Sequence, residues 1–239
     1  MSNDYLTMVV HGESKAGKTT LAATAPGPVL VMDAEAGGMR FVPGSKTIWD
    51  PARDGAPPEG FDIYQVVVKG LPDIESAFHY LTTNDHPFVS IVFDSLTEIQ
   101  ARMKRDHENN GVVDMQGWGR MLAKMEDLIW QFRDLAESPL TPVRMVVFLT
   151  GTNLKDGKYR PLMQGAIVKQ LPYKVDICGF LDVVNDANGN PVRGLRVSGS
   201  ELHDIGSRPP GLEQTIWNPN LSDLLNTIFN TNNQTKDTE

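Results

Sequence analysis

The feature that most constrains this chain is a short glycine-containing segment close to its amino end. Residues Gly12–Thr19 read GESKAGKT, which matches the spacing G-x-x-x-x-G-K-[ST]. The apolar stretch Tyr5–His11 before it has the composition of a strand, and Lys18–Thr24 has the pattern of a short helix. A strand, a glycine-rich turn and a helix in this order form the context in which such a loop cradles phosphate. The segment therefore predicts an α/β fold built around a phosphate-binding loop.

The residue types of this loop fit a nucleoside triphosphate bound together with Mg²⁺. Glycine lets backbone N–H groups turn toward phosphate oxygens without a Cβ in the way, and the amino end of the following helix adds partial positive charge. In this pattern Lys18 reaches the β- and γ-phosphates, and the Thr19 hydroxyl binds the metal. The predicted nucleotide-binding residues are Gly12, Glu13, Ser14, Lys15, Ala16, Gly17, Lys18, Thr19 and Thr20.

Apolar runs of strand length alternate with helical patterns along the rest of the chain. Strands are predicted at 29–33, 63–69, 88–94 and 143–149, and helices at 72–82, 95–105, 118–136 and 221–229. This alternation is typical of a mainly parallel central sheet flanked by helices. The segments 180–185 and 191–198 flank Asn188-Gly189, which predicts a C-terminal β-hairpin. We expect one domain over residues 1–229 and a polar, disordered tail over 230–239.

Composition narrows the class of protein without identifying a partner. Of the 239 residues, 40% are hydrophobic and 22% charged, which is ordinary for a globular domain. No apolar run is long enough to span a membrane, and the first residues lack the basic and apolar regions of a secretory signal. Together with a single cysteine, Cys178, this predicts a cytoplasmic protein. The net charge of -8 argues against a uniformly basic surface for nucleic acid but leaves a local basic groove open.

Two carboxylates follow predicted strands near the phosphate loop. Asp94 ends a buried strand, and the carboxyl ends of such strands form the edge where open α/β sheets bind ligands. We expect Asp94 to join Thr19 at the metal; the alternative is that Asp94 or Ser95 caps the next helix. Glu35 lies just past the second predicted strand, where a carboxylate can orient the water that attacks the γ-phosphate. The alternative for Glu35 is a solvated loop carboxylate.

The most specific segments of the chain are Gly12–Thr20 (GESKAGKTT), Val29–Gly38 (VLVMDAEAGG) and Ile91–Asp94 (IVFD). They resemble the corresponding motifs of RecA-type recombinases, and most closely those of phage-encoded, core-only RecA-like ATPases, which include single-strand annealing proteins. Arg160–Asp176 and Ile205–Leu225 are similar in spacing only. The resemblance implies a RecA-like P-loop core that binds ATP and Mg²⁺ between the subunits of a ring or filament and binds single-stranded DNA through loops.

The resemblance also implies roles for individual residues. Glu35 aligns with the catalytic glutamate of the family. Where the family has a Lys-x-Arg pair that reaches the neighbouring subunit's γ-phosphate, this chain reads Gly206-Ser207-Arg208, so Arg208 remains as a trans-acting candidate. The implied catalytic residues are Glu35, Lys18 and Arg208. A γ-phosphate sensor is implied after the strand that ends at Leu149, where the polar candidates are Thr150, Thr152 and Asn153.

DNA-facing loops are implied at 106–117 and 153–169. The second loop is basic in its own right, and its run Lys158-Tyr159-Arg160 can hold a phosphate backbone and stack a base. A solvated basic loop is the alternative interpretation. The predicted DNA-binding residues are Lys155, Lys158, Tyr159, Arg160 and Lys169.

Three hypotheses for function follow. The first is a Mg²⁺-ATP-dependent ATPase that binds single-stranded DNA and promotes annealing or strand exchange in phage-type recombination, as a homo-oligomer and in some settings with a single-strand-binding protein. The second is a P-loop ATPase that loads or regulates protein partners without touching DNA, which fits the acidic net charge. The third is a nucleotide or small-molecule kinase, which the fold permits but which the position of Glu35 and the hairpin-rich C-terminal third disfavour.

Overall fold

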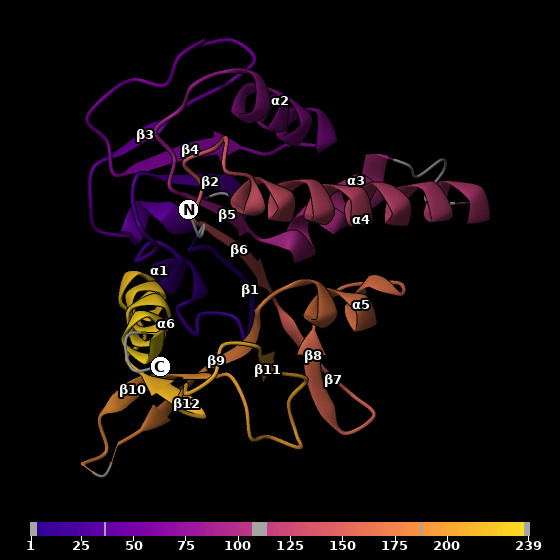
Figure 1. The fold of residues 1–239 in the computed structure, drawn as a ribbon. Coiled ribbons are helices and arrows are strands. Elements are labelled where there is room, and N and C mark those ends of the chain that lie inside the picture. The colour runs from indigo at the N-terminus through magenta and orange to yellow at the C-terminus, as the bar shows by residue number, and fades with distance from the viewer. Residues whose placement is uncertain (1–3, 36, 107–113, 187, 237–239) are drawn as a thin grey trace.

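The computed structural model describes residues 4–35, 37–106, 114–186 and 188–236, with side chains up to residue 229. A single large sheet forms its centre (Figure 1). The strands of this sheet are β1 Leu6–His11, β2 Val29–Asp33, β3 Lys46–Ile48, β4 Ile63–Val67, β5 Ser90–Asp94, β6 Met145–Thr150, β9 Ile177–Asn185, β10 Pro191–Arg196, β11 Gly206–Ser207 and β12 Thr215–Trp217. Their order is β12-β10-β9-β1-β6-β5-β2-β4-β3, and β11 pairs with β9.

The sheet is mainly parallel, as the sequence predicts. Every neighbouring pair from β9 across to β3 is parallel, and only β10, β11 and β12 pair antiparallel. The predicted C-terminal hairpin is confirmed as β9 and β10. The P-loop strand β1 is separated from the Asp94 strand β5 by β6, so the end of β6 lies between the phosphate loop and Asp94. The mainly parallel α/β sheet with an antiparallel C-terminal hairpin is thus the one that the sequence predicts.

Helices cover both faces of the sheet. They are α1 Lys18–Ala22, α2 Leu71–Thr83, α3 Leu96–Asp106, α4 Met115–Glu137, α5 Ile167–Lys174 and α6 Leu221–Lys236, with a short 3-10 turn η1 Gly38–Phe41. One apolar core joins the sheet to α2, α3, α4 and α5, and a second joins it to α1, η1 and α6. In Figure 1, α6 lies beside α1 on the second face. None of the helices within the described residues combines the length and apolarity needed to cross a membrane.

The central strands are buried on both faces. In β1, Val9 belongs to the core under α2 to α5, whereas Met8 and Val10 belong to the core under α1 and α6. This double burial explains why the central strands read as continuous apolar runs rather than as alternating patterns. Their carboxyl ends meet at one edge, because His11 pairs with Thr150 in register and Asp33 pairs with Asp94.

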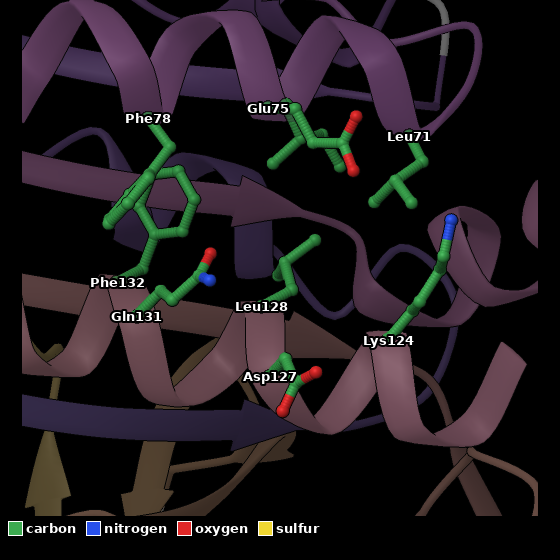
Figure 2. A pocket seen from close by; sticks show the side chains of 9 residues that line it. Leu71, Glu75, Phe78, Lys124, Asp127, Leu128, Gln131 and Phe132 are labelled. Carbon is green, nitrogen blue, oxygen red and sulfur yellow. The ribbon is translucent and has the colours of Figure 1, made fainter. Parts of the chain in front are cut away.

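The long helix α4 packs as its periodicity predicts, but it begins at Met115. Its buried face includes Met121, Met125 and Phe132. Figure 2 shows the rings of Phe132 and of Phe78 from α2 lying together at one end of a groove between the two helices, and the ring centroids are 5.3 Å apart. The apolar periodicity of both helices therefore serves packing against the sheet and against each other.

The structure corrects the expected loop at 153–169. This segment forms a two-stranded hairpin, β7 Thr152–Lys155 and β8 Lys158–Pro161, and then continues into α5. Asp156 and Gly157 make the turn with φ of 54° and 75°, the positive values that a tight hairpin turn requires. The other expected loop, 106–117, has residues 107–113 outside the described part of the chain, so its DNA-facing role stays a prediction.

The final helix is longer than the predicted 221–229, because α6 continues to Lys236. Asparagine and threonine have low helix propensity, so the sequence favours an earlier end. The helix is anchored by Leu221, Leu224 and Leu225, which are buried in the core shared with α1. Packing at its amino end therefore supports a helix that is longer than local propensity alone predicts.

Candidate functional site

A cavity of about 470 Å³ opens at the carboxyl edge of the sheet, where the phosphate loop leaves β1. Residues from the loop, from the ends of β2, β5 and β6, from α3 and from β10 converge on it. The lining residues are Gly12, Glu13, Ser14, Lys15, Gly17, Lys18, Thr19, Thr20, Glu35, Asp94, Thr97, Gly151, Thr152, Leu162 and Arg193. The cavity thus brings together Glu35, the predicted metal-binding residues and all the predicted nucleotide-binding residues except Ala16, which is buried and does not line it.

The backbone of the loop has the shape that an anion site needs. Lys15 and Gly17 both have positive φ, 66° and 98°, and a left-handed residue next to right-handed ones turns successive N–H groups toward one side. Gly12 is required for a different reason. A Cβ on Gly12 would lie 2.3 Å from the Leu181 carbonyl oxygen of β9, so any side chain there would push the loop off the sheet.

Lys18 begins α1 and lies over its own loop. Its Nζ donates hydrogen bonds to the carbonyl oxygens of Gly12 at 2.9 Å and Glu13 at 2.8 Å. Burial lowers the pKa of Lys18, and the nearby carboxylates of Glu35, Asp94 and Glu13 act against that lowering. An ammonium group held by two weakly charged carbonyl partners is available to exchange them for phosphate oxygens, which bind it more strongly.

Thr19 and Asp94 meet at the predicted metal position. The Thr19 hydroxyl donates to Asp94 Oδ2 at 2.7 Å, and Asp94 as a residue is only 2% exposed. Burial raises the pKa of Asp94 to about 6, an effect that the Thr19 hydrogen bond and Lys18 oppose and that Glu35 and Asp33 reinforce. A buried carboxylate beside a hydroxyl is a hard oxygen donor set of the kind that Mg²⁺ prefers. These residues therefore fit the ion.

Glu35 follows β2 and is held by groups from neighbouring elements. Its backbone N–H donates to Asp33 Oδ1 at 2.9 Å, and its Oε1 accepts from the Ser95 hydroxyl at 2.5 Å. Asp33 is itself buried and accepts a hydrogen bond from Gln65 of β4. The Arg102 guanidinium donates to the carbonyl oxygen of Ala34 at 2.7 Å. Glu35 is exposed, and its carboxylate lies in the cavity wall, held by Ser95, so the catalytic interpretation stays a prediction.

The sequence profile of a family described as AAA domain matches residues 4–208 of this chain. The chain belongs to this AAA domain family. The match spans the phosphate loop and every other residue of the cavity, so the chain is a P-loop NTPase. A comparison with curated proteins finds no match. A comparison with solved structures finds the flagellar accessory protein FlaH from Methanocaldococcus jannaschii, with 10% sequence identity, a TM-score of 0.49 and coverage of 89% of this chain and 84% of that chain.

Of the three sensor candidates in this AAA domain, Thr152 lines the cavity. Its Oγ1 donates to the carbonyl oxygen of Arg160 at 3.1 Å and lies 3.1 Å from Nδ1 of His11. His11 precedes Gly12 and is fully buried, and this burial lowers its pKa to about 3. A neutral histidine and a threonine therefore link the start of the phosphate loop to the β7–β8 hairpin. Thr150 and Asn153 do not line the cavity.

The predicted DNA-binding residues separate into two groups. Lys155, Lys158 and Lys169 are exposed. Arg160, by contrast, has a side chain that is 21% exposed and forms ion pairs with Asp156 at 3.6 Å and Asp204 at 3.8 Å.

Tyr159 is packed within the protein. Its ring stacks on His203 with centroids 5.3 Å apart and planes at 17°, and it lies 5.6 Å from the Phe180 ring. These contacts were not evident from the sequence, since His203 and Phe180 lie far from Tyr159 along the chain. The free cationic groups of the hairpin are therefore the lysines at its tip.

Arg208 lies at the opposite end of the sheet from the cavity in its own chain. Its guanidinium pairs with Asp176 at 3.2 Å and donates to the Tyr173 carbonyl oxygen at 2.7 Å. Asp176 also accepts hydrogen bonds from Thr7, near the start of β1, whereas the phosphate loop follows the other end of that strand. A trans-acting role for Arg208 stays a prediction, and it requires this ion pair to be given up or shared.

The groove in Figure 2 is a second hollow of the AAA domain, between α2 and α4. Its volume is about 230 Å³, and its lining includes Glu75, Lys124 and Asp127 together with apolar side chains. It shares no lining residue with the phosphate cavity. The groove is a gap between the packed helices α2 and α4, and the phosphate cavity remains the candidate site.

Proposed function

We propose that this AAA domain binds ATP with Mg²⁺ and hydrolyses it at the phosphate cavity. The observation that carries the proposal is the convergence on one cavity of Lys18, the Thr19–Asp94 pair and a positioned Glu35. When bound, Mg²⁺ would neutralise charge on the β- and γ-phosphates. Thr19 and Asp94 would hold it, the latter through water.

The other residues of the cavity supply orientation and charge. Lys18 exchanges its loop carbonyls for phosphate oxygens, where an ammonium stabilises the charge that develops on the leaving group. Glu35 accepts a hydrogen bond from the attacking water and aligns it with the γ-phosphate. The Ser95 hydroxyl fixes one carboxylate oxygen of Glu35 at 2.5 Å and leaves the other oxygen for that water.

We further propose that the protein binds single-stranded DNA through the exposed lysines of the β7–β8 hairpin and promotes annealing or strand exchange as a homo-oligomer. What supports this is the link from His11 through Thr152 to Arg160, which connects the phosphate loop to the hairpin. A nucleotide that displaces the phosphate loop would also displace the hairpin through these hydrogen bonds. Lys155 and Lys158 lie on either side of its turn.

The second candidate function, action on a protein partner, is favoured by a specific observation. The same hairpin carries Leu154, which is 62% exposed, and Leu202, in the segment between β10 and β11, is 61% exposed. The backbone N–H of Tyr159 donates to the Leu202 carbonyl oxygen at 2.8 Å, so the two leucines belong to one region. Apolar side chains beside lysines suit a protein surface as well as a nucleic acid.

The test is phosphate release from ATP with Mg²⁺, measured with and without single-stranded oligonucleotide. The proposal predicts hydrolysis by the protein alone and stimulation by the oligonucleotide that declines as salt rises. Hydrolysis that is indifferent to DNA, together with no oligonucleotide binding at low salt, would favour the protein-partner function. A phosphorylated acceptor in place of free phosphate would instead indicate a kinase.

A further inference from the structure

Arg193 of β10 lies in the wall of the phosphate cavity, although it is far from the phosphate loop along the chain. Among the described residues that line this cavity, the cations are Lys15, Lys18 and Arg193. The first two belong to the loop itself. Arg193 comes from the C-terminal hairpin, and the motif of the loop gives no indication of it.

The contacts of Arg193 are with the turn of the loop just before α1. Its Nε donates to the Ala16 carbonyl oxygen at 3.3 Å. A Cβ added to Gly17 would lie 2.3 Å from the same Nε. Gly17 therefore serves two purposes: it takes the positive φ of 98°, and it leaves the space into which the guanidinium fits.

The charge of Arg193 is available for a ligand. In the part of the chain that the structure describes, no acidic side chain lies within ion-pair distance of it. Arg196 on the same strand is different, because it pairs with Asp182 at 3.1 Å. The two arginines lie on opposite faces of the strand, since Arg193 shares the face of Leu195, which is buried in the core with α1.

We propose that Arg193 binds the α- and β-phosphates of the nucleotide held by its own subunit, an inference that rests on the proposed function. In loops of this type the backbone N–H groups cradle those two phosphates, while the loop lysine reaches the β- and γ-phosphates. Arg193 contacts Ala16 and Gly17 in that cradle, whereas Thr19 and Ser95 are the groups that contact Asp94 and Glu35. A guanidinium suits this place because its planar fork can bind two phosphate oxygens at once.

The test compares Arg193→Gln with Arg196→Gln, a matched change on the other face of the same strand. Calorimetry measures the Kd for Mg²⁺-ADP and Mg²⁺-ATP, and phosphate release at saturating ATP gives kcat. The proposal expects Arg193→Gln to raise both Kd values by a similar factor, roughly tenfold to a hundredfold. It expects kcat to change by less than about threefold, because an α/β contact is made equally in the ground state and the transition state. Arg196→Gln leaves both Kd values near those of the wild type.

Each other outcome has a distinct meaning. If the wild-type protein binds neither ADP nor ATP, the proposed function itself is wrong. Wild-type binding with an unchanged Kd in Arg193→Gln overturns the inference about Arg193 alone. A Kd raised for ATP but not for ADP, or a large loss of kcat, assigns Arg193 to the γ-phosphate and also overturns it. If Arg193→Gln is unfolded, Arg193→Lys, which keeps the charge but loses the fork, must raise both Kd values by a smaller factor.

Discussion

The phosphate cavity and the β7–β8 hairpin differ in how their charged groups are used. Around the cavity, Lys18 and Arg193 contact only backbone carbonyl oxygens in the described structure, which a ligand can replace. In the hairpin, Arg160 is paired with two carboxylates and Tyr159 is stacked on His203. The cavity is therefore arranged for an anionic ligand, whereas Arg160 and Tyr159 of the hairpin are already engaged in contacts within the protein.

The largest effect that tests the cavity side of this comparison is expected for Glu35→Gln. The amide keeps the size and one oxygen but loses the carboxylate that aligns the attacking water. We expect kcat to fall roughly 10²- to 10⁴-fold while the Kd for Mg²⁺-ATP stays within a few-fold. Phosphate release and calorimetry measure the two quantities. Glu75→Gln, in the groove of Figure 2, is the control; normal turnover in Glu35→Gln would show that another group orients the water.

Lys18→Ala should give the next largest effect. Loss of a charge-assisted contact to the triphosphate costs about 1.5–3 kcal/mol, so the Kd for Mg²⁺-ATP should rise roughly a hundredfold at most. Lys104→Ala, on α3 outside the phosphate cavity, controls for removal of a lysine. Equal affinity in the two variants would mean that the nucleotide is not bound at this loop.

His11→Gln tests the link between the two regions through pH. The folded-state pKa of His11 is about 3, below its ordinary 6.5, so the unfolded chain takes up the proton first. Stability contributed by neutral His11 is thus present above about pH 6.5 and is lost as the pH falls toward 3. Between pH 8 and 5 the wild type should lose roughly 2 kcal/mol more than His11→Gln. Urea unfolding at the two pH values measures this loss of unfolding free energy, with His79→Gln as the control. Equal losses in the wild type and in His11→Gln would mean that His11 is in contact with water.

The smallest effect is expected on the hairpin side. Lys155→Gln with Lys158→Gln should weaken single-stranded DNA binding roughly tenfold at low salt and reduce the salt slope by about 1.4, two phosphate contacts on a single strand. Fluorescence anisotropy over a salt series measures both. Lys69→Gln with Lys124→Gln changes the net charge equally at exposed sites elsewhere. If both double variants weaken DNA binding by the same factor, the hairpin lysines are not the site that contacts DNA.

The sequence predicted most of the fold, and it predicted the phosphate loop, Asp94 and Glu35 as cavity residues, for a common reason. The phosphate loop follows β1, Asp94 is the last residue of β5 and Glu35 lies two residues past β2, so the parallel sheet brings them together without any knowledge of long-range packing. The carboxyl ends of parallel strands share one edge, and the register of Asp33 with Asp94 and of His11 with Thr150 shows this alignment.

What the sequence did not show depends on pairing between distant segments. Arg193 reaches the loop because β9 lies beside β1 and β10 returns along it, which no local pattern encodes. Tyr159 looked free to stack on a base because His203 and Phe180 are remote in the chain. One signal was present: Asp156-Gly157 between residues of strand type is a hairpin turn, and it could have replaced the expected loop.

The central claim is that the cavity at the end of β1 holds Mg²⁺-ATP. Titration calorimetry of the wild-type protein with ATP in the presence of Mg²⁺ tests it most directly. The account predicts saturable binding of one nucleotide per chain that weakens when Mg²⁺ is chelated. Folded protein that shows no binding of ATP at millimolar concentration, with the metal present, would contradict it.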